Sequence, residues 1–262
     1  MVNINTLNTL KKNAEKIAVL TSYDATFARV SEQAGVEVLL VGDSLGMVVQ
    51  GQQSTVPVTM DEMVYHTANV TRVTENAFVM ADMPFMSYAN LDLVLLNAGR
   101  LMKEGGAQMV KLEGGAVQLE TVAHLTSHSI PVCGHLGLLP QSIHQLGSYK
   151  VQGKDQEQAQ QIKADALGLE KAGAQMLVLE CVPSDLASDI ANSLSIPVIG
   201  IGAGADVDGQ VLVVYDMLGL NTEYMPRFVK NFLADNMSIQ DAISAYVKAV
   251  KANTFPTKEH SY

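Results

Sequence analysis

Residues 36–44 read VEVLLVGDS, an apolar run that ends in an aspartate and a serine. It is one of eight such runs: IAVLTSYD (17–24), VEVLLVGDS (36–44), AFVMADMP (77–84), AQMVKLEGG (107–115), IPVCGHLG (130–137), AQMLVLECVP (174–183), IPVIGIGAG (196–204) and QVLVVYDMLG (210–219). Continuous Val, Ile, Leu and Met, without alternating polar residues, are typical of strands buried on both faces in a parallel sheet. The runs therefore predict eight parallel strands.

Segments with helical character separate these runs. They are 26–34, 59–74, 90–104, 116–127, 156–172 and 184–193, and two more, 226–232 and 239–252, follow the last run. Thr59, ahead of Asp61 and Glu62, is the expected N-cap of its helix. Eight alternating units predict a (β/α)8 TIM barrel. An N-terminal helix up to about Lys16 is expected to close its bottom.

The length fits a single domain, because one barrel of this type needs about 250 residues. We expect residues 1–262 to form that one domain. Lys and Arg number 17 against 27 Asp and Glu, which gives a formal net charge of −10. This charge argues against nucleic acid or an anionic membrane as partners.

The sequence predicts a cytoplasmic protein. Cys133 and Cys181 both lie inside apolar runs, which favours two buried free thiols in a reducing compartment over a disulfide. The N-terminus has no apolar core of a secretory signal, and no run of about 20 apolar residues predicts a membrane span. Two long loops, 45–58 and 138–153, are expected at the barrel mouth as lids or substrate walls.

Polar side chains stand near the ends of seven of the runs. They are Asp24, Asp43, Asp82, Glu113, His135, Glu180 and Asp216. In a (β/α)8 barrel the carboxyl ends of the strands meet at one mouth, so these side chains are predicted to surround a common site. Glycines in 199–204 (IGIGAG) fit either an anion-binding loop at that mouth or close packing of strand against helix.

Three carboxylates on neighbouring strands point to a cation. Asp43, Asp82 and Glu113 would repel one another unless an ion lay between them. Oxygen ligands without clustered Cys or His favour Mg²⁺, or Mn²⁺, over Zn²⁺. Mg²⁺ commonly takes one or two protein carboxylates, so Glu113 is expected to act through water. The alternative is that the carboxylates cap loops or pair with Arg and Lys.

Four further residues are candidates for substrate contacts. Lys111 shares a strand face with Glu113 and either holds a substrate carboxylate or forms a Schiff base, and the nearby negative charge favours the charged, carboxylate-binding role. Ser44 either meets the same ligand or caps the following loop. His135, among glycines, either contacts a ligand or is hydrogen-bonded in the core. Glu180 ends an apolar strand and is a candidate proton acceptor, or else a buried partner of a cation.

Several motifs resemble the ketopantoate hydroxymethyltransferase family. They are VLLVGDSLGMVVQG, STVPVT, ADMPFMSY, MVKLEGG, PVCGHLGLLPQS, YKVQG, LVLECVP and IPVIGIGAG, and the match is continuous from about residue 17 to the C-terminal HSY, weakest around 214–219. The resemblance implies a (β/α)8 barrel that uses Mg²⁺ and 5,10-methylenetetrahydrofolate to hydroxymethylate 3-methyl-2-oxobutanoate. It also implies a cytoplasmic homo-oligomer, commonly a decamer.

The resemblance also implies roles for individual residues. Asp43 and Asp82 would bind the metal directly, and Glu113 would complete the metal site through water. Ser44 and Lys111 would hold the keto-acid carboxylate. Glu180 would be the proton acceptor, and His135 would lie near the substrate.

Two rival functions stay open at this stage. A Mg²⁺-dependent carbon–carbon lyase of the phosphoenolpyruvate mutase and isocitrate lyase type would share the barrel, the metal and the 2-oxo acid chemistry. It needs no one-carbon donor, so products formed without folate separate it from a transferase. A non-catalytic barrel that senses a keto acid is the third interpretation, which the clustered carboxylates disfavour.

Overall fold

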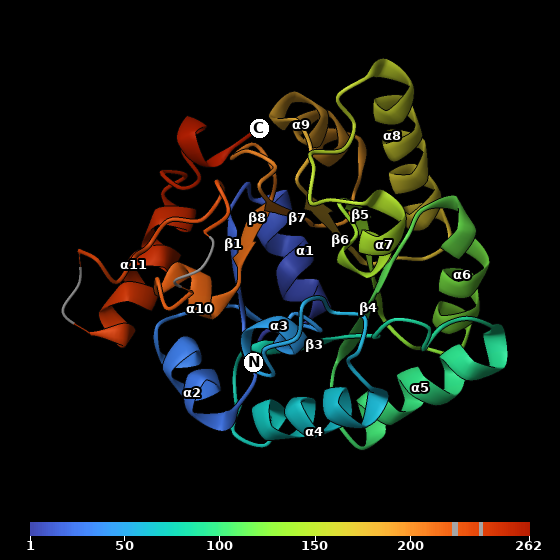
Figure 1. Cartoon of the computed structure of the whole chain (residues 1–262), viewed down its shortest axis with the longest axis horizontal. Coiled ribbons are helices and arrows are strands. Elements are labelled where there is room, and N and C mark those ends of the chain that lie inside the picture. Colours follow the sequence, from blue (N-terminus) through green and yellow to red (C-terminus); the bar gives the residue numbers. More distant parts are fainter. Residues whose placement is uncertain (222–224, 236–237) are drawn as a thin grey trace.

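The structure is a computed structural model that describes residues 1–221, 225–235 and 238–262. Eight parallel strands close into a barrel in chain order, and β8 returns to pair with β1 (Figure 1). The strands are β1 (Ile17–Thr21), β2 (Val38–Val41), β3 (Phe78–Asp82), β4 (Met109–Glu113), β5 (Val132–Gly137), β6 (Met176–Glu180), β7 (Val198–Ile201) and β8 (Gly209–Leu212). The predicted (β/α)8 barrel is confirmed.

Except for α1, which precedes β1, the helices follow the strands around the outside of the barrel. They are α1 (Ile4–Lys12), α2 (Ala25–Gln33), α3 (Leu45–Val48), α4 (Met60–Thr71), α5 (Leu91–Lys103), α6 (Leu119–Ser127), α7 (Ile143–Leu146), α8 (Gln156–Lys171), α9 (Ser184–Ser193), α10 (Val214–Met217) and α11 (Ile239–Lys251). Side-chain caps start several of them. Thr59 and Glu62 form a reciprocal capping box at α4, which confirms the predicted N-cap.

Alternate residues of each strand point into the barrel, and their character changes along the strand. The inner apolar cluster takes Phe78 and Met80 from β3 and Met109 from β4. One further step along the same faces come Asp82 on β3 and Lys111 on β4. Because side chains alternate between the two faces of a strand, the interior is apolar at the bottom and charged at the mouth.

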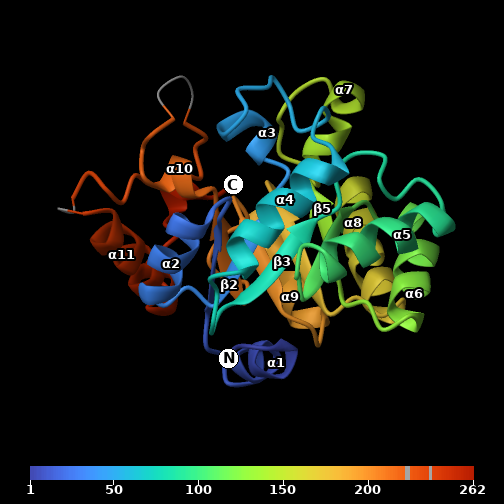
Figure 2. The same cartoon turned by 90° about the horizontal axis from the view of Figure 1, so that it is seen from below.

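The N-terminal helix covers the bottom of the barrel. Leu7 is buried in the inner cluster, and Ile4 and Leu10 pack against the same cluster. Figure 2 shows α1 beneath the barrel, at the end opposite to α3 and α7. The predicted closing role is confirmed, although the helix ends at Lys12 rather than near Lys16.

Two parts of the C-terminal prediction are wrong. The run 210–219 is not one strand, because β8 ends at Leu212 and Thr21 Oγ1 accepts a hydrogen bond from the backbone N–H of Val214 where α10 begins. Residues 226–232 form a turn rather than a helix. Asn231 Oδ1 accepts the N–H groups of Leu233 and Ala234, a local turn that competes with helix formation.

No helix within residues 1–221, 225–235 and 238–262 is both long enough and apolar enough to cross a bilayer.

Candidate active site

Five adjacent strands bring the predicted site residues to one mouth. Asp43 and Ser44 follow β2, Asp82 ends β3, Lys111 and Glu113 lie on β4, His135 lies on β5, and Glu180 ends β6. Strand pairing sets Lys111 beside Asp82 and His135 beside Glu113. These seven candidates for metal binding, substrate binding and catalysis therefore lie at the same mouth.

Two further predicted carboxylates, Asp24 and Asp216, have hydrogen-bond partners of their own. Asp24 is the N-cap of α2, where its side chain accepts the N–H groups of Thr26 and Phe27. Asp216 lies on α10 rather than at a strand end, and Asn221 Nδ2 donates to it over 3.3 Å. The expectation that Asp24 lines the common site is wrong, because its carboxylate caps α2. Asp216 follows β8, and burial together with the Asp216 charge raises the pKa of Tyr23, whose hydroxyl contacts Ser44.

The metal candidates are linked by backbone as well as side chain. The backbone N–H of Asp43 donates to Asp82 Oδ2 over 3.1 Å. Gly42 makes this turn possible, since a Cβ there would lie 2.7 Å from Ser44 Oγ. The Ser44 hydroxyl in turn lies 2.9 Å from the hydroxyl of the buried Tyr23. The GDS sequence thus presents a carboxylate and a hydroxyl from one tight turn.

Lys111 is a buried cation among the carboxylates. Its Nζ lies 3.1 Å from Asp82 Oδ1 and 3.2 Å from His135 Nδ1. Burial alone lowers the pKa of Lys111, but the carboxylates of Asp82, Glu113 and Asp43 outweigh it and raise the pKa above its usual value. The side chain is therefore charged, which favours electrostatic binding of an anion over Schiff-base chemistry.

The neighbours of His135 determine which of its ring nitrogens carries the hydrogen. The ammonium of Lys111 can only donate to Nδ1, so the neutral ring carries its hydrogen on Nε2. Burial and Lys111 lower the pKa of His135, which keeps the ring neutral. Nε2 lies 3.2 Å from Glu180 Oε2, so this ring nitrogen directly contacts the candidate base. His135 thus faces both the cation and the candidate base.

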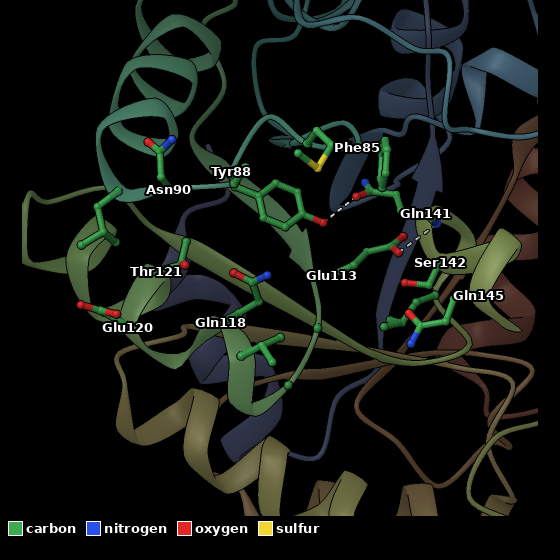
Figure 3. A pocket seen from close by; sticks show the side chains of 17 residues that line it. Phe85, Tyr88, Asn90, Glu113, Gln118, Glu120, Thr121, Gln141, Ser142 and Gln145 are labelled. Carbon is green, nitrogen blue, oxygen red and sulfur yellow. Dashed lines mark hydrogen bonds between the residues drawn. The ribbon is translucent and has the colours of Figure 1, made fainter.

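Gln141 is a site residue that sequence reasoning missed. Its side-chain nitrogen donates to Asp43 Oδ2 over 2.8 Å, and its backbone N–H donates to Glu113 Oε2 over 3.1 Å. Tyr88 donates its hydroxyl to the amide oxygen over 2.5 Å (Figure 3). A glutamine in a loop gives no chemical signal in a sequence, and its importance comes from the packing of three loops.

The donor set fits a hard divalent cation held by two carboxylates. Burial together with the carboxylates of Asp82 and Glu113 raises the pKa of Asp43, and Asp82 Oδ1 is buried beside the Lys111 ammonium, 3.1 Å away, without an aligned hydrogen bond. A bound cation would offset the burial of the Asp43 charge and give Asp82 Oδ1 a second partner. In the described part of the chain no three His, Cys, Asp or Glu side chains converge as a ready-made ligand set. Two direct carboxylates are what Mg²⁺ commonly takes.

The two long loops lie at the barrel mouth, as predicted. Residues 45–58 begin with α3, and 138–153 contain α7, and both lie at the mouth in Figure 2. Tyr149 OH contacts Met47 Sδ at 3.9 Å, so the two loops meet. The IGIGAG glycines serve close packing, since a Cβ at Gly204 would lie 2.6 Å from Ser184 Oγ.

Comparison of the whole chain with known proteins identifies its relatives. The family model of ketopantoate hydroxymethyltransferase matches residues 1–258. The 3-methyl-2-oxobutanoate hydroxymethyltransferase of Nitrosococcus oceani is 58% identical over 261 residues, covering 100% of this chain and 99% of the relative. That of Pseudomonas fluorescens is 56% identical over 262 residues, covering 100% and 98%.

Solved structures with low identity share the fold. A phosphonopyruvate hydrolase in complex with oxalate and Mg²⁺ aligns with a TM-score of 0.63 at 14% identity, covering 96% of this chain and 99% of that one. A 2,3-dimethylmalate lyase of the PEP mutase/isocitrate lyase superfamily aligns with a TM-score of 0.59 at 17% identity, covering 84% and 82%. The full-length match in sequence is the stronger finding, and it shows that the chain belongs to the ketopantoate hydroxymethyltransferase family.

Proposed function

We propose that this enzyme transfers a hydroxymethyl group from 5,10-methylenetetrahydrofolate to 3-methyl-2-oxobutanoate and forms 2-dehydropantoate with the help of Mg²⁺. The names of its relatives support the ketopantoate-forming reaction. The observation that carries the mechanism is the joint placement at one mouth of the buried Lys111 ammonium, the Asp43–Asp82 pair and the more accessible Glu180.

Each residue has a role that follows from its surroundings. Asp43 and Asp82 would hold the metal directly, and Glu113 would act on it through water. When bound, Mg²⁺ supplies Lewis-acid polarisation of the 2-oxo acid, which makes its C3 proton more acidic. The Lys111 ammonium and the Ser44 hydroxyl would hold the substrate carboxylate, with Tyr23 orienting that hydroxyl.

Glu180 is the proposed proton acceptor. Its side chain is 15% exposed, against 6% for Asp82 and 4% for Glu113, so it borders the space that a substrate would enter. His135 would present Nε2–H toward Glu180 and help to orient its carboxylate. A positioned carboxylate of this kind typically contributes about 10²–10⁴-fold to the rate.

The overall exchange of atoms is balanced by one water. The C3–H bond of the keto acid breaks, its proton passes first to Glu180, and C3 forms a carbon–carbon bond to the donor methylene. Water supplies the hydroxyl that remains on this carbon as both of its bonds to carrier nitrogens break. The two carrier nitrogens take up two protons, one derived from C3 and one from water.

Proton exchange tests the proposed function without the donor. The protein is incubated with Mg²⁺ and 3-methyl-2-oxobutanoate in D₂O, and the C3 proton is followed by NMR. We expect exchange that a chelator abolishes. A second incubation with tetrahydrofolate covers the case in which the carrier must bind first. Absence of exchange in both, with no hydroxymethyl product from the complete mixture, would overturn the proposal.

The homo-oligomeric state, a decamer by the resemblance, and the cytoplasmic location stay predictions. Cys133 and Cys181 are both buried free thiols, which supports a reducing compartment. Sedimentation velocity on the full chain tests the oligomer, since a decamer of a 28.1 kDa chain would have a mass about ten times larger.

A further inference from the structure

A cavity of about 560 Å³ opens beside the carboxylate cluster, between the loops that follow β3, β4 and β5. Glu113 and Gln141 line it, and both also belong to the cluster. Tyr88 lines it as well and donates to Gln141 (Figure 3). Gln141 in turn contacts Asp43. The cavity and the candidate metal ligands therefore share a wall, and a molecule in the cavity would adjoin the keto acid.

The lining of the cavity selects the chemistry of its occupant. None of its seventeen residues, all within the described part of the chain, is Lys, Arg or His, whereas Glu113 and Glu120 are carboxylates. An anionic group would find no counter-charge here. Carboxamides of Asn90, Gln118 and Gln145 offer donors and acceptors to the edge of a nitrogen heterocycle.

The rim adds apolar surface for a flat ring. Phe85 is 43% exposed and Val117 is 82% exposed, and both line the cavity. Exposed aromatic and apolar side chains around a polar floor are typical of sites for planar ligands, which stack on one face and hydrogen-bond at the edge. The volume lies within the range of about 300–1,000 Å³ found for small-molecule sites.

We propose that this cavity seats the carrier ring of the one-carbon donor, an uncharged, planar, nitrogen-rich bicyclic ring of the pterin type, beside the Glu113–Gln141 wall. The inference rests on the proposed function, because it assumes a donor that carries the one-carbon unit on ring nitrogens. Any acidic tail of the donor would lie outside, since the lining offers it no cation.

Kinetics with the Mg²⁺-loaded full chain test the assignment. The variants Phe85→Ala and Gln118→Ala each remove a lining side chain, and Leu167→Ala and Gln160→Ala on α8 are matched controls. Leu167 is as exposed as Phe85, at 43%, and Gln160 is also exposed. We expect the two cavity variants to raise KM for 5,10-methylenetetrahydrofolate at least tenfold. The KM for the keto acid and the C3 exchange rate should stay within twofold.

Calorimetric titration with tetrahydrofolate gives a second readout, in which Kd should rise by a similar factor in both cavity variants. A donor KM and a Kd within twofold of wild type in both variants would overturn the inference. A parallel loss of C3 exchange would also overturn it, because it would assign the cavity to the keto acid. A change in sedimentation alone would overturn it too, because it would assign the cavity to contact with a second copy of the chain. If the wild-type enzyme forms no product, the proposed function itself fails, which is a separate outcome.

Discussion

Glu180 differs from its neighbours in accessibility and in partners. Its carboxylate contacts Nε2 of His135, whereas the less exposed Asp82 lies beside Lys111 and the less exposed Glu113 lies beside Nδ1 of His135. Replacing Glu180 by Gln keeps the shape and removes the basic oxygen. We expect C3 exchange to fall about 10²–10⁴-fold while binding of Mg²⁺ and keto acid persists.

NMR exchange and calorimetry check this expectation together. Glu157→Gln on α8 is the matched control, because it makes the same chemical change at an exposed carboxylate that is not one of the candidate site residues. Exchange at the wild-type rate in Glu180→Gln would remove the residue from the role of base.

Asp82 joins the proposed metal site to Lys111. Its Oδ2 accepts the N–H of Asp43 and its Oδ1 faces the ammonium, so one carboxylate serves both functions. We expect Asp82→Asn to weaken Mg²⁺ binding and keto-acid binding together, each at least about tenfold. Calorimetric titration of each ligand, with Asp189→Asn on α9 as control, measures both. Unchanged affinity for either ligand would contradict a shared site.

Single residues show how far the sequence could predict this site. Asp43, Asp82, Glu113 and Glu180 stand at the ends of apolar runs, so their convergence follows once the barrel is inferred. The prediction for Asp24 is wrong because an aspartate at a strand end is equally suited to cap the next helix, as Asp24 does at α2. Gln141 escapes prediction because its contacts come from the meeting of loops that are distant in the sequence.

At the scale of elements, α1 separates stability from chemistry. Leu7 is buried at the bottom of the barrel, at the opposite end from the candidate active site (Figure 2). We expect Leu7→Ala to lower the free energy of unfolding by about 2–5 kcal/mol, the usual cost of a core truncation to alanine. Kinetic constants measured well below the unfolding midpoint should not change.

Chemical denaturation and steady-state kinetics on the same sample measure the two effects of Leu7→Ala. Leu96→Ala, an exposed leucine on α5, is the control for the loss of side-chain atoms alone. A large change in KM for the keto acid would show that the bottom helix is coupled to the mouth.

Individual elements also show where local sequence signals are enough to predict secondary structure. Helices with a capping residue ahead of an apolar stripe, such as α4 after Thr59, are predicted well because the signal lies within one segment. Residues 226–232 carry apolar side chains at helical spacing. Val229 and Phe232, however, pack into the apolar layer between the barrel and its helices, while Phe228 also contacts the inner apolar cluster. Burial on two sides cannot be read from spacing alone.

At the scale of the whole molecule, the fold buries several carboxylates at the barrel mouth, and their burial makes the stability of the protein depend on pH. Burial raises the pKa of Glu113 to about 7, from an ordinary value near 4.5. Between these two values the folded metal-free protein binds a proton that the unfolded chain has released. The stability that this proton confers is present below pH 4.5 and is lost as the pH rises to 7.

We therefore expect the metal-free wild type to become less stable between pH 4.5 and 7, and Glu113→Gln to show a shallower decline because an amide cannot ionise. Thermal unfolding with chelator across this range measures the difference, and Glu157→Gln should follow the wild type. Adding Mg²⁺ should restore wild-type stability most strongly near pH 7, since the cation favours the ionised carboxylates. Equal slopes for wild type and Glu113→Gln without metal would mean that the Glu113 carboxylate is not held protonated by burial. The source of any decline would then lie elsewhere, first of all in Asp43, whose pKa burial also raises.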